Sequence, residues 1–186
     1  MKLIPIFVVE DREVGIWSIQ LDNKSRSEFE EFFDLVNDIE WLRRFFIQNS
    51  SDLQDRFFRG ITIEAAVLKT LDEAEEMEDL LYRYAEETVE GSGRHLQQLF
   101  KPLNNYEYAL VAHQKSKARI RQGWLRLYAI RFAPNCYLVT GGAIKLTYSM
   151  TSGHLQTELR KLDLAKQYLR NNGIDYPEDL NNYKNE

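Results

Sequence analysis

The chain has 186 residues, of which 44% are hydrophobic and 28% charged, with a formal net charge of −5 at pH 7. Its single cysteine, Cys136, excludes an internal disulfide and a cysteine-rich metal site. No run approaches the roughly 20 apolar residues needed to span a bilayer, and the short apolar start is broken by Pro5 and followed by acids, unlike a signal peptide. We therefore expect a soluble cytoplasmic protein that does not contact a membrane.

The first half predicts a hairpin followed by two long helices. Residues 2–9 and 14–21 are rich in β-branched and aromatic side chains, with a polar connection between them, which predicts two paired strands. Residues 27–49 carry large apolar side chains at spacings of three and four, typical of one amphipathic helix. Residues 63–88 repeat that pattern, and Thr62 precedes them as a predicted helix start.

The second half predicts three strands after a break at 90–94, where the sequence reads EGSGR. The strand candidates are 106–113, 124–132 and 136–146. Only the short segment 133–135 separates the second and third candidates, so we expect these two strands to pair antiparallel.

A short helix ending near Pro102 precedes these strands, and a helix over about 154–172 follows them. The expected fold class is α+β, with an antiparallel sheet and helices packed on one of its faces. We expect a single domain over 1–172, followed by a polar tail over 173–186.

The charge differs in sign between the two halves. Residues 1–93 hold 10 Lys and Arg against 22 Asp and Glu, whereas residues 94–186 hold 14 against 7. Within the second half, the segment 113–123 contains four cations and no acid, and an extended chain would direct all four to one side. These cations are Lys115, Lys117, Arg119 and Arg121. They indicate binding to the phosphates of a nucleic acid. The alternatives are an acidic protein partner, the chain's own acidic helices, or an ordinary solvated loop.

Two arginines lie on the strand candidate 124–132. Arg126 and Arg131 are five residues apart, so a strand places them on opposite faces. One of them therefore lies among core residues, where a guanidinium needs a partner or a function. Arginine is suited to bidentate contact with phosphate.

The next strand ends in a further candidate group. Gly141 and Gly142 permit a kink or the close approach of a ligand, and Lys145 and Tyr148 follow them. A lysine and a tyrosine on a sheet that also carries Arg126 are suited to stabilising charge on a phosphate during its transfer. The alternative is an ordinary strand end with an exposed lysine.

The histidines do not indicate a metal site. His95, His113 and His154 are far apart and lack the spacing of metal ligands, and no nucleotide-binding or nucleophile-elbow motif is present. We therefore expect neither metal nor cofactor. His113 opens the basic segment and is a candidate general base near neutral pH, although such a residue is more often a surface histidine.

The second half resembles the RelE/ParE/HigB toxin superfamily of bacterial toxin–antitoxin systems, most of all its HigB-like branch. The resemblance covers about residues 96–172 and depends on short motifs around the predicted strands and in the last helix. The matching residues are Leu103, Tyr106, Glu107, Arg126, Tyr128, Gly142, Lys145, Thr147 and Ala165.

This resemblance implies a RelE-like core over 94–172 and an enlarged, acidic and helical first half over 1–93. It implies metal-independent cleavage of messenger RNA, including RNA on the ribosome, and inhibition by a small helix-turn-helix antitoxin. Arg126 and Lys145 would hold the scissile phosphate, and His113 or a lysine of the basic segment would transfer protons. Two alternatives remain open: a gyrase poison of the ParE kind, and a non-enzymatic protein-binding module. The acidic half could also cover the basic face as an antitoxin would.

Overall fold

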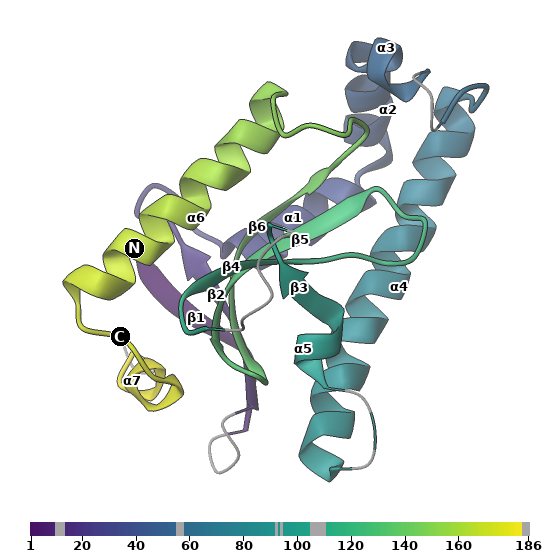
Figure 1. Ribbon diagram of the computed structural model, residues 1–186. Helices are drawn as coiled ribbons and strands as arrows, with labels where there is room; N and C mark the ends of the chain where they lie inside the picture. Colours follow the sequence, from purple (N-terminus) through teal and green to yellow (C-terminus); the bar gives the residue numbers. More distant parts are fainter. Residues whose placement is uncertain (10–13, 55–57, 92, 94, 105–110, 184–186) are drawn as a thin grey trace.

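The computed structural model has one mixed sheet with helices on both sides (Figure 1). It describes residues 1–9, 14–54, 58–91, 93, 95–104 and 111–183. Within these residues the sheet has six strands in the order β1-β2-β6-β5-β4-β3. Their bounds are β1 Lys2–Val9, β2 Val14–Gln20, β3 Phe100–Pro102, β4 Gln114–Ala118, β5 Leu125–Ala133 and β6 Cys136–Ile144. The expected α+β class is confirmed.

The first hairpin joins the two halves of the chain in this sheet. β1 and β2 pair antiparallel with Val9 opposite Val14, as the sequence predicts. β2 then pairs with β6 in parallel, from Gly15 opposite Cys136 to Ser18 opposite Val139. β5 and β6 form the predicted antiparallel pair. Strands from the acidic and the basic half therefore share one sheet.

The helices of the first half differ from the prediction at one point. They are α1 Glu28–Asn37, α2 Ile39–Gln48, α3 Ser50–Leu53 and α4 Ile63–Glu90. The expectation of one helix over 27–49 is wrong, because Asp38 is extended and ends α1. Its side chain also accepts a hydrogen bond from the Trp41 N–H, so it caps α2. The predicted start of α4 is confirmed, since Thr62 caps it by accepting from Ala65 N–H.

Helices cover both faces of the sheet rather than the single face expected. Along β5, Leu125 and Leu127 belong to the core that contains α1, α2 and α4, whereas Tyr128 and Ile130 belong to a second core beneath α6. Figure 1 shows α6 and α4 on opposite sides of the strands. Because side chains alternate along a strand, β5 contributes to both cores.

The strand predicted over 106–113 lies only partly within the described residues. Residues 105–110 lie outside the described part of the chain, and Val111–His113 are not in a strand. Instead β4 occupies Gln114–Ala118, inside the segment expected to be a basic loop, and pairs with β5. β3 is the edge strand next to β4, and it follows directly on the short helix α5 Leu96–Leu99.

The C-terminal segment is part of the fold rather than a polar tail. α6 covers Gly153–Asn171 and is followed by a short helix, α7 Pro177–Asn181. Ile174 and Leu180 are buried in the core beneath α6. The boundary expected at 173 is therefore wrong, because two apolar side chains after it complete that core. No helix in the described residues is long and apolar enough to cross a membrane.

Candidate functional site

Strands β4, β5 and β6 place basic side chains on the face of the sheet that α6 partly covers. Lys117 lies opposite Tyr128, and Arg126 is two residues before Tyr128 on the same face. The Lys145 N–H donates to the Trp124 carbonyl at 2.8 Å, which extends the β5–β6 pairing and places Lys145 on this face as well. With the adjacent Arg119, these residues form what we call the cation cluster: Lys117, Arg119, Arg126 and Lys145.

Arg126 is held by backbone carbonyls at the start of β5. Its Nη1 donates to the carbonyls of Gly123 at 2.8 Å and Leu125 at 2.7 Å. Burial lowers the pKa of the half-buried guanidinium, and the positive charge of Arg119 lowers it further. The carbonyls fix the side chain and carry no net charge, so the positive charge of Arg126 is not neutralised by them.

The Lys145 ammonium is held by the loop that follows β6. Its Nζ donates to the carbonyls of Thr147 at 3.1 Å, Tyr148 at 2.7 Å and Ser149 at 3.3 Å. The Tyr148 side chain is 90% exposed in this loop. The ammonium and the phenol therefore belong to one short segment at the border of the cation cluster.

The four cations act electrostatically on one another. Burial lowers the pKa of Lys145, and the charges of Arg126 and Lys117 lower it further. Burial also lowers the pKa of Lys117, and the positive charges of Arg119 and Arg126 lower it further. The Lys117 Nζ donates a hydrogen bond to the Leu103 carbonyl at 2.8 Å. Like charges at a half-buried surface repel, so a bound anion would relieve this repulsion.

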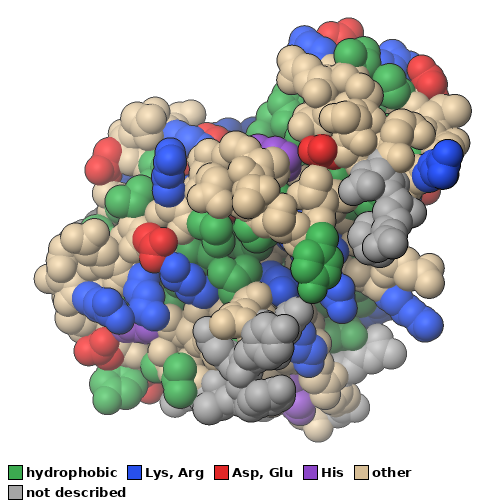
Figure 2. Space-filling model, turned by 45° about the horizontal axis from the view of Figure 1, so that its top comes forward, with side chains coloured by type: hydrophobic (Ala, Val, Ile, Leu, Met, Phe, Trp, Pro, Cys, Tyr) green, Lys and Arg blue, Asp and Glu red, His purple; other side chains and the backbone are tan. Residues whose placement is uncertain are grey.

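No acidic side chain in the described ranges forms an ion pair with Arg119, Arg126 or Lys145. The acidic α4 packs on the other face of the sheet, with α1 and α2. The sequence left open whether the acidic helices cover the basic face of the same chain. Because these helices pack on the other face of the sheet, they do not cover the cation cluster. Figure 2 shows Lys and Arg side chains across one side of the molecule, with fewer Asp and Glu side chains among them.

Three of the other predicted contact residues are not members of the cation cluster. Lys115 shares the face of the cluster but forms an ion pair with Asp163 of α6 at 2.6 Å. Arg121 is exposed in the turn that follows buried Ile120. Arg131 is buried on the opposite face, opposite Tyr137 in the β5–β6 pair. The four cations of the basic segment therefore do not form one row.

The structure does not bring His113 to Arg126 and Lys145. His113 immediately precedes β4, whereas Lys117 is four residues further on, roughly 13 Å along an extended chain. Its ring is buried, packs edge-on against Phe132 at 5.2 Å and lies 3.9 Å from the Asp175 carboxylate. Burial lowers the pKa of His113. These contacts describe a packed histidine rather than a base beside the cluster.

One residue of the site matches the toxin resemblance but was given no role in the site from the sequence. Tyr128 is fully buried between the positions of Lys117 and Arg126, and its hydroxyl donates to the Met150 sulfur at 3.6 Å. Burial raises the pKa of this phenol. Tyr128 therefore forms a neutral floor beneath the cluster. Its position two residues after Arg126 on a strand was the signal that could have identified it.

The described residues contain no group of three His, Cys, Asp or Glu side chains that could hold a metal ion. No protein-family model matches the chain, and comparisons with curated proteins and with solved structures found no match.

Proposed function

We propose that this chain is the toxin of a type II toxin–antitoxin system, similar to RelE and HigB toxins, and that it cleaves messenger RNA in the cytoplasm. One observation supports this proposal above the others: Lys117, Arg126 and Lys145 lie together on one sheet face, and Arg119 is near enough to act electrostatically on Lys117 and Arg126. An RNA backbone supplies closely spaced phosphates that would neutralise these charges.

The cluster suits cleavage by the RNA's own 2′-hydroxyl. In that reaction the hydroxyl oxygen attacks the adjacent phosphorus and its proton passes to a base. The bond to the 5′ oxygen breaks, and that oxygen receives a proton from an acid, which leaves a cyclic phosphate and a free 5′-hydroxyl. In this proposal Arg126 stabilises the charge that develops on the phosphate oxygens.

The proton transfers fall to lysines of the cluster rather than to His113. The pKa values of Lys117 and Lys145 are both lowered by burial and by neighbouring cations, which moves them toward the range useful for acid–base catalysis. Tyr148, exposed beside Lys145, is a further candidate acid. His113 has no role in this scheme because it lies at the other end of β4.

Induced expression in bacteria tests this function. Growth should stop and messenger RNA should be cleaved, and both effects should disappear in Arg126→Ala and Lys145→Ala. Arg83→Ala is the matched control, because Arg83 is an exposed cation on α4, on the far side of the sheet. A short neighbouring reading frame encoding a helix-turn-helix protein should restore growth when it is co-expressed.

The same cultures distinguish the two alternatives. DNA damage with intact messenger RNA would instead indicate a gyrase poison. Unimpaired growth, with a co-purified protein and no RNA, would indicate a non-enzymatic binding module. Growth arrest that is unchanged in both substituted chains would remove the roles assigned to Arg126 and Lys145.

A further inference from the structure

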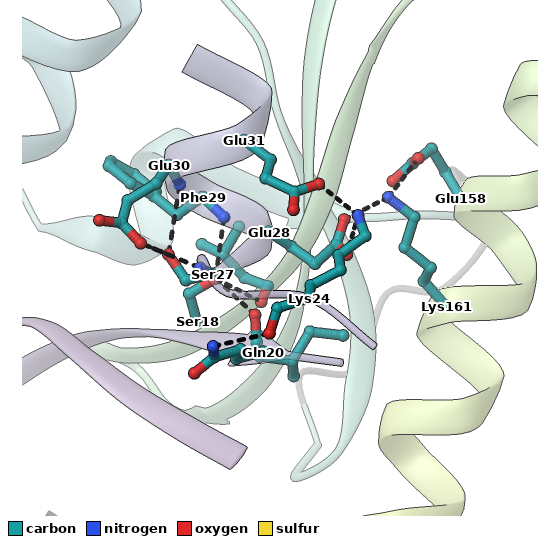
Figure 3. Close-up of polar contacts among 12 residues, drawn as sticks. Ser18, Gln20, Lys24, Ser27, Glu28, Phe29, Glu30, Glu31, Glu158 and Lys161 are labelled. Carbon is teal, nitrogen blue, oxygen red and sulfur yellow. Dashed lines mark hydrogen bonds and ion pairs between the residues drawn. The ribbon is translucent and has the colours of Figure 1, made fainter. Parts of the chain in front are cut away.

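Several lysines of the chain are neutralised by acids, and Lys145 of the cation cluster is not one of them. The lysines that pair with a carboxylate are Lys24, Lys69, Lys115 and Lys161. Figure 3 shows Lys24 and Lys161 with their glutamate partners at the junction of α1 and α6. Lys24 lies 2.6 Å from Glu28, and Lys161 lies 2.5 Å from the same side chain.

Lys145 contacts cations and carbonyls instead. Among the residues that the structure describes, no carboxylate pairs with it, and its Nζ donates to the carbonyls of residues 147–149. Arg126 is opposite Ala143 in the β5–β6 pair, and Lys145 is the next residue along β6 on that face. The Lys145 ammonium and the Arg126 guanidinium therefore belong to diagonal neighbours on one face.

These different partners change how readily each lysine loses its proton. Burial acts to lower the pKa of Lys24, but its two glutamate partners raise the pKa overall. Burial lowers the pKa of Lys145, and the positive charges of Arg126 and Lys117 lower it further. At neutral pH a larger fraction of Lys145 than of Lys24 is thus the unprotonated amine, which is the nucleophilic form of lysine.

The cation cluster also offers a binding place for a phosphate beside this amine. Two backbone carbonyls hold the Arg126 guanidinium without neutralising it, and Arg119 is exposed next to it in the cluster. A guanidinium binds phosphate oxygens in a fixed geometry. The positive surface raises the local concentration of small anions.

We propose that Lys145 is a site of covalent acylation by acyl phosphates, the mixed anhydrides of a carboxylic acid and phosphoric acid. The cation cluster binds the phosphate part of the reagent, which brings the attached acyl carbon to Lys145 Nζ. The group that the cluster binds is also the group that leaves.

The reaction is a simple acyl transfer. The lone pair of the unprotonated Nζ attacks the acyl carbon, and a carbon–nitrogen bond forms. The bond from that carbon to the phosphate oxygen breaks, and inorganic phosphate leaves with the electron pair. The nitrogen gives one proton to water. The product is a neutral amide whose remaining N–H can still donate to a carbonyl of the loop.

Acylation removes one positive charge from the cluster. Under the proposed function, on which this consequence rests, the acylated chain lacks a cation that contacts the RNA phosphate and an amine that transfers protons. RNA cleavage should therefore stop when Lys145 is acylated. The acylation itself does not depend on RNA or on its cleavage.

Incubation of the intact chain with acetyl phosphate, followed by mass spectrometry of its proteolytic peptides, tests this proposal. Lys115 and Lys101 are internal controls in the same sample, because Lys115 shares the sheet face but pairs with Asp163, and Lys101 is an exposed lysine. We expect Lys145 to be acetylated about tenfold faster than either control. Its rate should rise between about pH 6 and about pH 9, as the amine loses its proton.

Three further measurements separate phosphate binding from the reactivity of the amine. Arg126→Ala should slow acetylation of Lys145 by about tenfold and leave Lys101 unchanged, because a phosphate-binding group is lost. Arg83→Ala, on the far side of the sheet, should change neither rate. Excess inorganic phosphate should protect Lys145 but not Lys101. The uncharged reagent p-nitrophenyl acetate should distinguish Lys145 from Lys101 less than acetyl phosphate does.

Equal rates at Lys145 and Lys101 with acetyl phosphate would overturn the proposal. An unchanged rate at Lys145 in the presence of excess inorganic phosphate would also overturn it, because the cluster would then not hold the reagent. Neither measurement involves RNA, so a negative result here leaves the proposed nuclease to its own test. Absence of RNA cleavage would likewise leave the acylation of Lys145 standing.

Discussion

The Glu73 carboxylate accepts a hydrogen bond from the Trp124 N–H at 2.9 Å, across 51 positions of the chain. The same oxygen accepts from the Leu125 N–H at 2.9 Å, and the other oxygen pairs with Lys69 at 2.6 Å. Glu73 is only 3% exposed. One acid of the long helix α4 thus fixes the start of β5, immediately before Arg126.

Replacing this acid should destabilise the fold. Glu73→Ala leaves two buried N–H groups without an acceptor, so we expect the free energy of unfolding to fall by about 3 kcal/mol. Glu73→Gln retains an acceptor oxygen and should lose less. Urea denaturation measures both values, with Glu75→Ala at an exposed position of the same helix as the control. A loss in Glu73→Ala no larger than in the control would show that this contact does not stabilise β5.

Much of the fold follows from periodicity in the sequence. The hairpin of β1 and β2, the β5–β6 pair and helix α4 were predicted, because alternating or helical apolar spacing is strong in each. The break at Asp38 was missed because the apolar spacing continues across it. A capping aspartate inside an amphipathic run was the available signal.

The candidate site was predicted less completely. Alternation along β5 correctly separates Arg126 from Arg131. The proximity of Arg126 to Lys145 depends on the register between β5 and β6, which the sequence alone does not specify. His113 was misplaced because β4 begins after it, so the histidine stands at the far end of the strand. Ion pairing of Lys115 with Asp163 depends on where α6 crosses the sheet.

Gly142 accommodates a neighbouring ring rather than a ligand. A Cβ at this position would lie 2.5 Å from the Phe32 ring of α1. Gly142→Ala should therefore lower the free energy of unfolding by about 1–3 kcal/mol, since the ring cannot retreat without moving α1. Gly153→Ala is the control, because an added Cβ there meets no atom of the described residues within 4 Å. Thermal unfolding followed by circular dichroism distinguishes the two chains, and equal melting temperatures would refute the contact.

Glu158 should make stability depend on pH. Its folded-state pKa of about 7 exceeds that of an exposed glutamate, so the folded state binds the proton more tightly. The associated stability is fully present below the unfolded pKa and is lost as the pH rises through about 7.

Comparison with Glu158→Gln isolates this effect, because the other titrating groups are common to both chains. Between about pH 5 and about pH 8 the substituted chain should gain about 2 kcal/mol relative to the original. Chemical denaturation at a series of pH values provides the measurement. A stability difference that stays constant with pH would mean that Glu158 ionises as an ordinary surface glutamate.

The salt dependence of RNA affinity tests the cation cluster most directly. A single-stranded RNA carrying 2′-O-methyl groups binds without being cleaved, and removal of one cation that neutralises a phosphate should lower the slope of log affinity against log salt by about 0.7. We predict that Arg126→Ala and Arg119→Ala each lower the slope by that amount, whereas Arg83→Ala leaves it unchanged. A slope that is the same in the unaltered chain and in all three substituted chains would contradict the assignment of RNA binding to this face.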